Sequence, residues 1–268
     1  MDKYILDLQV VSVERIHERY VLIKLTDDKP FPQTCPGQFV EVLVDGSPTT
    51  FLRRPISINF VDYEANELWL LVATVGAGTR RLAGLCRGDR LNCVLPLGMG
   101  FGQPILQRRY LLVGGGVGVA PLLYQGYVLS HSYEDMEVTF LLGARSAKDL
   151  LLLQEFSKYG RVLTTTEDGS AGEKGFVTDH SVLRQERFDM IQCCGPTPMM
   201  KAVVSYAWKH KVDCQVSLEN LMACGLGACL CCVEKVKQRD ADGTEAVRNV
   251  CVCKEGPVFN KEELLWQS

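Results

Sequence analysis

Three cysteines in one short segment constrain this chain more than any other feature of its sequence. Cys224, Cys229 and Cys232 are spaced as C-x4-C-x2-C, and further cysteines follow downstream. Plant-type ferredoxins hold a [2Fe–2S] cluster with this spacing. Gly225 and Gly227 permit the tight backbone that turns three thiolates toward one centre and leaves amides to hydrogen-bond the sulfurs. The spacing therefore predicts an iron–sulfur cluster; the alternative is a zinc knuckle, which usually combines two C-x2–4-C halves.

The chain offers two cysteines, Cys251 and Cys253, for the fourth ligand position. Both point to the same face of an extended strand, so periodicity does not choose between them. Cys231 adjoins Cys232 and is expected to point away from the same iron. The chain has 12 cysteines, a high number for a cytosolic protein, in which structural disulfides are rare. This number favours metal binding or redox chemistry.

The pattern along the chain divides it into three predicted domains, at 1–104, 105–215 and 216–268. The first is rich in β-branched and aromatic residues between turn signals, which predicts a small β-barrel or sandwich. Its expected strands are 4–16, 20–26, 38–44, 56–62 and 67–75. The second alternates strands with helices, which predicts parallel βαβ units. Its expected helices are 120–133, 147–159 and 196–211. The third is cysteine-rich and predicted to be loop-like, with a solvated hairpin tip within 235–249.

Two turns in the second domain follow predicted strands. The first contains Gly114, Gly115, Gly116 and Gly118, then Pro121, and the second is Cys194-Gly195-Pro196. Glycines at such a place let a phosphate approach backbone amides at the start of a helix, although a turn of this kind is also found with a purely structural role. Both turns are expected at the carboxyl ends of strands, where open α/β sheets bind ligands. The loop with Gly169, Gly172 and Gly175 is either a plain turn or part of the same nucleotide site.

The first domain contains Arg54-Pro55-Ile56-Ser57 and, further on, Gly78-Thr79. Arginine supplies a phosphate contact, and the serine and threonine hydroxyls supply further donors. An exposed arginine on a strand is ordinary, so this motif carries little weight by itself.

Charge and hydropathy exclude other classes of protein. The formal net charge is -3, which lacks the basic surplus of a general nucleic-acid binder. No apolar run reaches the roughly 18–20 residues of a membrane span, and the N-terminal segment lacks the pattern of a signal peptide. We therefore expect a soluble cytoplasmic protein with no nucleic-acid or membrane partner. No Ser/His/Asp constellation is present, so no catalytic acid, base or nucleophile is predicted.

Taken in order, these motifs resemble the ferredoxin–NADP reductase superfamily and, within it, the iron–sulfur flavoprotein electron-transfer subunits of class 1B dihydroorotate dehydrogenases. The segments that carry the resemblance are LRRPISI, VGAGTRRL, GGGVGVAPLL, TEDGSAGEKGFVTD, CGPTPMM and SLENLMACGLGAC…CKEGPVF. The chain departs from the pattern at Ile56, where the superfamily often has an aromatic residue. The resemblance implies an α+β multidomain fold with an N-terminal antiparallel β-barrel for FAD, a central α/β parallel-sheet nucleotide domain and a small C-terminal [2Fe–2S] domain.

The resemblance also assigns site residues. It implies that FAD is held by Arg54, Pro55, Ile56 and Ser57, by backbone around Leu71, Val72 and Ala73, and by Gly78 with Thr79. It implies that NAD uses the turns with Gly114, Gly115, Gly116, Gly118 and with Cys194, Gly195, Pro196. The cluster ligands that it implies are Cys224, Cys229, Cys232 and, from the ending CKEGPVF, Cys253.

The implied activity is electron transfer in pyrimidine biosynthesis, from the FMN of a dihydroorotate dehydrogenase catalytic subunit through [2Fe–2S] and FAD to NAD+. The expected assembly is a heterotetramer with two copies of each subunit. NAD is the expected nucleotide, although Arg145 at a strand end would also suit the 2′-phosphate of NADP. The alternatives are a related reductase subunit of another complex (a sulfite or sulfide reductase or a ferredoxin–NADP oxidoreductase) and a metal-binding module without turnover.

Overall fold

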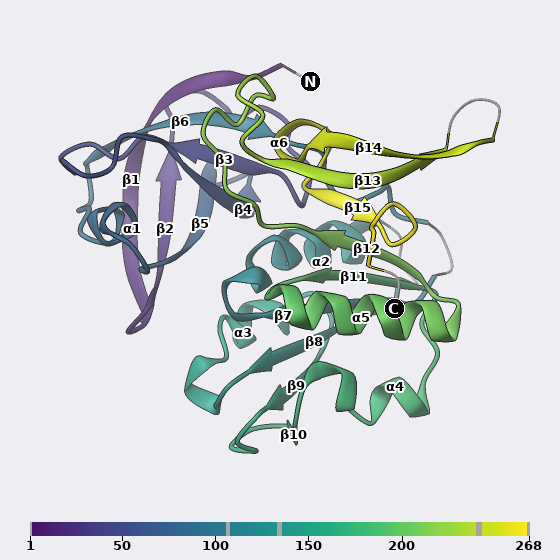
Figure 1. The fold of residues 1–268 in the computed structure, drawn as a ribbon. Helices are drawn as coiled ribbons and strands as arrows, with labels where there is room; N and C mark the ends of the chain where they lie inside the picture. The colour runs from purple at the N-terminus through teal and green to yellow at the C-terminus, as the bar shows by residue number, and fades with distance from the viewer. Residues whose placement is uncertain (1, 106–107, 133–135, 240–242, 267–268) are drawn as a thin grey trace.

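The computed structural model describes residues 2–105, 108–132, 136–239 and 243–266. Three parts follow one another along the chain: a β-barrel, a mostly parallel sheet with helices on both faces, and a cysteine-rich segment that ends at the sheet (Figure 1). Within these residues, no helix is long and apolar enough to cross a membrane.

The N-terminal part is a closed antiparallel barrel, as predicted. Its strands are β1 (Tyr4–His17), β2 (Tyr20–Thr26), β3 (Phe39–Val42), β4 (Arg54–Asp62), β5 (Glu67–Ala73) and β6 (Arg90–Leu97). Their order is β1-β2-β5-β4-β3-β6, and β6 closes the barrel by pairing with both β1 and β3. Inward-facing residues such as Leu8, Ile23 and Leu70 are fully buried, which is the pattern that alternating strands require. The short helix α1 (Ala77–Leu82) follows β5.

The central part is a seven-stranded sheet in the order β10-β9-β8-β7-β11-β12-β15. All neighbouring pairs are parallel except the last, in which β15 runs antiparallel to β12. The strands are β7 (Tyr110–Gly115), β8 (Val138–Ala144), β9 (Arg161–Thr166), β10 (Glu173–Lys174), β11 (Met190–Cys194), β12 (Asp213–Ser217) and β15 (Val258–Asn260). The long helices α2 (Ala120–Ser132) and α5 (Thr197–His210) cover opposite faces, and the short turns η3 (Val177–Asp179) and α4 (Val182–Gln185) join β10 to β11 (Figure 1).

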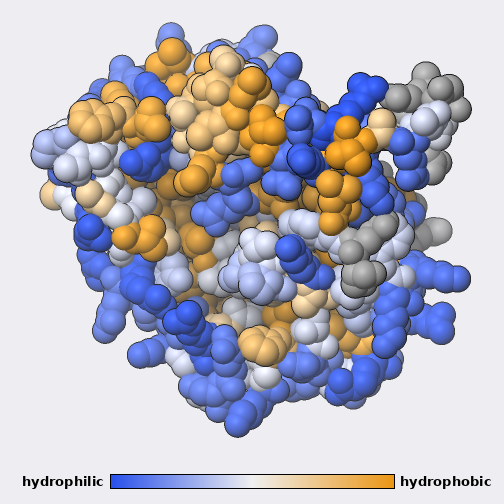
Figure 2. Space-filling model, in the orientation of Figure 1, coloured by the Kyte–Doolittle hydropathy of each residue, from blue (hydrophilic) through white to orange (hydrophobic). Residues whose placement is uncertain are grey.

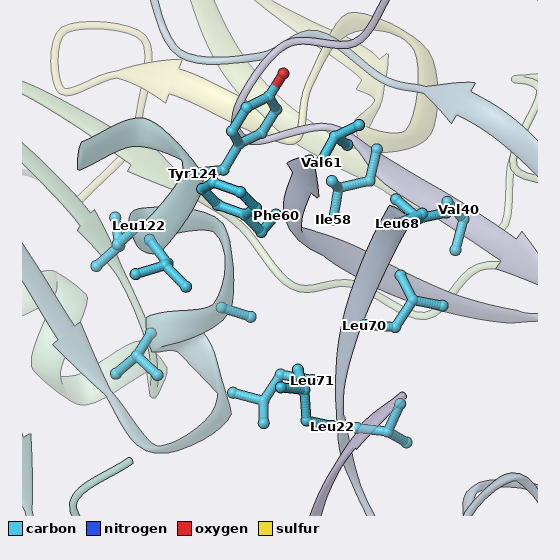
Figure 3. Packing of buried hydrophobic residues seen from close by; sticks show 14 of the residues in the cluster. Leu22, Val40, Ile58, Phe60, Val61, Leu68, Leu70, Leu71, Leu122 and Tyr124 are labelled. Carbon is cyan, nitrogen blue, oxygen red and sulfur yellow. The ribbon is translucent and has the colours of Figure 1, made fainter. Parts of the chain in front are cut away.

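Strand β7 separates two hydrophobic cores. Tyr110 and Leu112 belong to one core and Leu111 and Val113 to the other, because successive side chains of a strand point to opposite faces. The first core continues through α2 into the barrel, where Tyr124 and other α2 side chains lie against barrel residues (Figure 3). The second core includes α5 and the cysteine-rich segment. That core also includes Phe39 and Leu97 of the barrel, so the cysteine-rich part packs against both the sheet and the barrel.

Of the three predicted helices in this part, 120–133 and 196–211 are confirmed, apart from residue 133, which lies outside the described residues. The predicted helix over 147–159 is wrong. The chain forms a 3₁₀ turn, η2 (Ala147–Asp149), and one short helix, α3 (Leu153–Phe156). Leu152 between them has a φ of 54°, in the left-handed region, which breaks a continuous helix. With the chain interrupted in this way, Leu151 and Phe156 are both buried in the first core.

The cysteine-rich part has more regular structure than the sequence predicted. The strands β13 (Val233–Arg239) and β14 (Glu245–Cys251) form an antiparallel hairpin, followed by the short helix α6 (Val252–Glu255). The predicted tip is confirmed as the end of a hairpin, and its residues 240–242 lie outside the described ones. The chain then returns to the central sheet as β15.

Candidate functional site

The two glycine turns lie side by side at the carboxyl ends of β7 and β11. Gly114 and Cys194 are paired residues of these parallel strands. A methyl group on Gly118 would come 2.4 Å from the Cα of Gly195, so the two turns are in direct backbone contact. The connections after β7 and β11 run to opposite faces of the sheet, which makes this the switch point where open α/β sheets bind ligands. The predicted convergence of the two turns is confirmed.

A pocket of about 560 Å³ opens at this edge. Of the predicted nucleotide residues, Gly115, Gly116 and Pro196 line it. The others lie behind the pocket wall: Gly118 and Gly195 pack against each other, Gly114 contacts Val119 and Leu122, and Cys194 is buried. Gly116 has a φ of +56°, which a glycine adopts without strain and which turns the chain into the 3₁₀ turn η1 (Gly116–Val119).

The opposite wall of the pocket contains an exposed aromatic ring. Phe176 lines the pocket with 63% of its surface exposed, unusual for so large an apolar side chain. Its backbone N–H donates a 2.8 Å hydrogen bond to Asp179, and Gly175 before it has a φ of +126°. The backbone of this turn is therefore fixed, and it presents the ring to the pocket, where the ring can stack on a planar ligand. The sequence analysis noted the glycines of this loop but missed the phenylalanine.

Charged groups of both signs line the same pocket. Arg145 and Asp149 follow β8, Glu167 follows β9, and Arg19 and Tyr20 come from the barrel. Of these residues, Arg145 alone was predicted from the sequence. No local pattern marks Arg19 or Tyr20, since they reach the pocket only through the packing of the barrel on the sheet.

A second site lies on the barrel, where β4 and β5 diverge. The β4–β5 ladder ends at the pair Ile58–Leu70, while β5 continues along β2 as far as the pair Tyr20–Ala73. The first residues of β4, the predicted Arg54, Pro55, Ile56 and Ser57, pair instead with β3. The backbone edge of Leu71, Val72 and Ala73 that faces β4 is therefore not paired with that strand. It borders a slot between the two strands, where its backbone groups can hydrogen-bond the polar edge of a flat ligand. The predicted flavin residues of the two strands lie on either side of this slot.

The glycine segment of α1 lies beside the start of β4. A methyl group on Gly78 would come 3.3 Å from Nε of Arg54 and 3.0 Å from Thr50. The backbone N–H of Gly76 donates a 3.1 Å hydrogen bond to the Thr79 hydroxyl. Arg54, Gly78 and Thr79 are therefore brought together as predicted, with a guanidinium beside a glycine backbone. Such a pair fits a diphosphate group.

The cysteine loop wraps backbone amides around its sulfurs. Leu226 N–H donates to Sγ of Cys224 at 3.3 Å, Gly227 N–H to Sγ of Cys253 at 3.1 Å, and Cys253 N–H to Sγ of Cys232 at 3.4 Å. Gly225 and Gly227 have φ values of +64° and +82°, as their predicted role in the tight loop requires.

The hydrogen bond from Leu226 N–H is the main cause that lowers the pKa of the Cys224 thiol to about 6. Donors aimed at sulfur stabilise thiolates, the form that binds iron. Burial has the opposite effect on Cys253, whose pKa is raised to about 12. A metal's charge overcomes such a shift on coordination.

Both cysteines considered for the fourth position lie beside Cys232. Cys253 in addition accepts a hydrogen bond from the Gly227 N–H at its sulfur, whereas the Cys251 thiol donates a long 3.8 Å hydrogen bond to the Gly227 carbonyl. Within the described part of the chain, no three His, Cys, Asp or Glu side chains form a site for a single metal ion. The donor set of four thiols, with backbone amides on the sulfurs of Cys224, Cys232 and Cys253, fits an iron–sulfur cluster, which distributes its ligands over two irons.

A buried carboxyl lies beneath this loop, and sequence analysis missed it. Glu41 on β3 is 1% exposed, and both of its side-chain oxygens lack a hydrogen-bond partner. A methyl group on Gly225 would come 2.6 Å from its Cγ. Burial raises the pKa of Glu41 to about 7, although the nearby Arg53 lowers it. The only sequence signal is an acidic residue inside the otherwise apolar strand FVEV.

Two family models match parts of the chain. Residues 219–265 match the family model described as the iron–sulfur cluster binding domain of dihydroorotate dehydrogenase B, and residues 112–205 match the oxidoreductase NAD-binding domain. The chain thus contains an iron–sulfur domain and a NAD-binding domain in the predicted order.

Individual relatives match nearly the whole chain. The dihydroorotate dehydrogenase B (NAD(+)) electron transfer subunit of Bacillus velezensis is 40% identical over 96% of this chain and 97% of the relative. The subunit of the same name from Caldanaerobacter subterraneus subsp. tengcongensis is 41% identical over 86% of this chain and 87% of the relative. A solved chain of the NADH-dependent reduced ferredoxin–NADP oxidoreductase superposes with a TM-score of 0.82 at 30% identity, covering 97% of this chain and 90% of that chain. The chain therefore belongs to the family of electron transfer subunits of NAD-dependent dihydroorotate dehydrogenase B, flavoprotein reductases with an iron–sulfur domain.

Proposed function

We propose that this chain transfers electrons between a catalytic subunit, which oxidises dihydroorotate with FMN, and NAD+, through a [2Fe–2S] cluster and FAD. The observation that carries the proposal is the order of the three sites across the barrel. Tyr20 pairs with Ala73 at the flavin slot and also lines the nucleotide pocket. Glu41, which pairs with Pro55 on the other side of the slot, lies beneath the cysteine loop. The flavin slot therefore lies between the nucleotide pocket and the cluster loop.

This order matches the chemistry of the cofactors. A flavin exchanges a hydride with nicotinamide and single electrons with an iron–sulfur cluster, so it connects the two when placed between them. The chain's own task is to hold each group at a fixed place and to orient it. Hydride transfer between flavin and nicotinamide requires no acid or base from the protein.

We assign the groups to residues as follows. Cys224, Cys229, Cys232 and Cys253 hold the cluster. FAD is held by Arg54, Pro55, Ile56, Ser57, the backbone of Leu71, Val72 and Ala73, and Gly78 with Thr79. The nucleotide lies over Gly115, Gly116 and Pro196, with Gly114, Gly118, Cys194 and Gly195 shaping the turns behind them. Support for this assignment comes from the diverging strands, the paired turns and the amides directed at sulfur.

We propose NAD rather than NADP as the nucleotide. Arg145 would suit a 2′-phosphate, but the carboxylate of Glu167 lines the same pocket and would repel it. Reduction of an artificial dye by NADH and by NADPH compares the two directly. A clear preference for NADPH would contradict this assignment.

The catalytic subunit is proposed to bind over the cysteine loop. Leu221, Leu226 and Leu230 around the cysteines are exposed, Leu221 by 81%. Figure 2 shows hydrophobic side chains gathered where the loop between β12 and β13 crosses the barrel. Exposed apolar side chains that gather on one face mark contact sites. A cluster at this face is close to its electron donor, and a permanent assembly of two copies of each subunit would keep it covered.

The test compares the purified chain alone with the chain co-expressed with the catalytic subunit, both prepared anaerobically. The lone chain should show flavin and [2Fe–2S] bands and should pass electrons from NADH to an artificial acceptor. Reduction of NAD+ by dihydroorotate should require the partner. Rapid dihydroorotate-dependent reduction by the lone chain would refute the division of labour, and a colourless zinc-containing preparation would favour a metal-binding module without turnover.

A further inference from the structure

The turn between β1 and β2 reaches from the barrel to the rim of the nucleotide pocket. Arg19 and Tyr20 line the pocket from this turn. A methyl group on Gly116 would come 3.8 Å from the Tyr20 hydroxyl, so the turn faces the glycine segment across the pocket. Backbone amides of that segment are the groups proposed above to approach the nucleotide phosphates. The β1–β2 turn therefore faces the phosphate end of the site from the opposite wall.

One carboxylate of the nucleotide domain fixes this turn. Oδ1 of Asp149 is 3.4 Å from Nη2 of Arg19 and 3.7 Å from Nε2 of His17. Oδ2 accepts a 2.6 Å hydrogen bond from the Ser146 hydroxyl. The backbone N–H of Arg19 donates to Nδ1 of His17, which leaves the ring proton on Nε2, facing Asp149. The Ser146 hydrogen bond is the largest cause that lowers the pKa of Asp149, and the Arg19 charge adds to it, so this carboxylate is ionised.

The ion pair leaves part of Arg19 available for a ligand. Its side chain is 54% exposed, and a guanidinium has five N–H donors, of which Nη2 alone contacts Asp149. An exposed ion pair adds little to protein stability by itself. A guanidinium held in one orientation beside a diphosphate, in contrast, makes strong charge-assisted hydrogen bonds.

We propose that Arg19, supplied by the flavin barrel, binds the pyrophosphate of the nicotinamide nucleotide, and that Asp149 is the positioning residue that holds its guanidinium. The proposal rests on the nucleotide site proposed above and adds to it a contact from another domain. Thr74 N–H donates a 2.8 Å hydrogen bond to the Arg19 carbonyl, which ties the same turn to the strand end beside the flavin slot. One turn thus relates the position of the nucleotide to that of the flavin.

The experiment uses the FAD- and cluster-loaded chain. Calorimetry gives the Kd for ADP-ribose, which carries the pyrophosphate but no nicotinamide, and anaerobic rapid mixing with NADH gives the Kd and the limiting rate of flavin reduction. Arg19→Ala should raise both Kd values roughly tenfold, and this difference from the wild type should become smaller at high salt. The limiting rate of flavin reduction and the flavin content should stay unchanged. Arg19→Lys should recover part of the affinity. Asp149→Asn should raise the two Kd values by less than Arg19→Ala does. Added to Arg19→Ala, it should not change them further.

Arg15→Ala is the matched control. Arg15 lies on the same hairpin, is exposed and donates to the Glu18 carbonyl at 3.1 Å, outside the pocket lining, so both Kd values should stay unchanged. Wild-type ADP-ribose affinity in Arg19→Ala with full flavin content would overturn the proposal. An equal effect of Asp149→Asn with and without Arg19 would overturn the positioning role. Failure of the wild-type chain to bind ADP-ribose would overturn the nucleotide site itself, and the Arg19 proposal with it.

Discussion

Replacing Gly118 by alanine tests whether the contact between the two glycine turns controls nucleotide binding. The added methyl carbon would lie 2.4 Å from the Cα of Gly195, against an ordinary contact of at least 3.4 Å, so the turns must separate by about 1.0 Å. The methyl carbon is fixed to its own backbone, and the atoms that it meets are backbone atoms of Gly195 and Cys194, so neither group can rotate away. Overpacking of this kind costs roughly 1–3 kcal/mol. The reduced freedom of the unfolded chain returns about 0.4–1 kcal/mol, which leaves a net loss of roughly 1–2 kcal/mol.

The assay combines denaturant unfolding with NADH titration. We expect a lower unfolding midpoint and an NADH Kd raised by roughly a factor of ten or more, because a displacement near 1 Å at a binding turn is costly. Gly84→Ala is the control, since its methyl group would meet the Arg81 carbonyl oxygen at an ordinary 3.5 Å. Unchanged unfolding and unchanged NADH affinity in Gly118→Ala would refute the idea that the turns support each other.

Four further predictions follow from the sites. Arg54→Ala should weaken FAD retention by on the order of 1.5–3 kcal/mol, measured as flavin content after extensive dialysis. Cys253→Ser should abolish the paramagnetic signal and iron content, whereas Cys251→Ser should keep both; the reverse pattern would reassign the fourth ligand. Glu41→Gln should raise the free energy of unfolding by up to roughly 3 kcal/mol above pH 7 and should leave it unchanged below pH 4.5. The reason is that the pKa of Glu41 is raised from 4.5 to about 7, so the ionised wild-type residue destabilises the folded chain only as pH rises. The same difference in unfolding free energy between variant and wild type at about pH 4.5 and at about pH 8 would contradict this. Phe176→Ala should raise the Kd of NADH and Phe176→Tyr should not, as flavin-reduction titrations would show.

Local patterns predicted much of this fold. The alternation in β2 and β5 indicated a barrel, and the two glycine turns and the cysteine spacing indicated where ligands bind. Each of these signals depends on neighbours within a few residues, which a sequence displays directly. The helix over 147–159 failed because burial in the first core and the left-handed Leu152 outweighed helix propensity.

The residues that were missed depend on contacts between distant segments. Arg19 and Tyr20 reach the nucleotide pocket because the barrel packs on the sheet through α2. Glu41 lies under a loop more than 180 residues further along the chain. The place of β15 in the central sheet was missed for the same reason, because three residues carry no periodicity of their own.

The return of the chain to the sheet through β15 has a mechanical consequence. The cysteine-rich part leaves the sheet after β12 and re-enters it beside β12, and Met99 N–H of the barrel donates a hydrogen bond to the Gly256 carbonyl just before that return. A segment tethered at both of its ends has no hinge about which to swing. Electrons should therefore cross one fixed distance at every turnover, without the shuttling of a mobile domain. The amide hydrogens of β12 and β15 should accordingly exchange with deuterium together, in a single opening of the sheet edge.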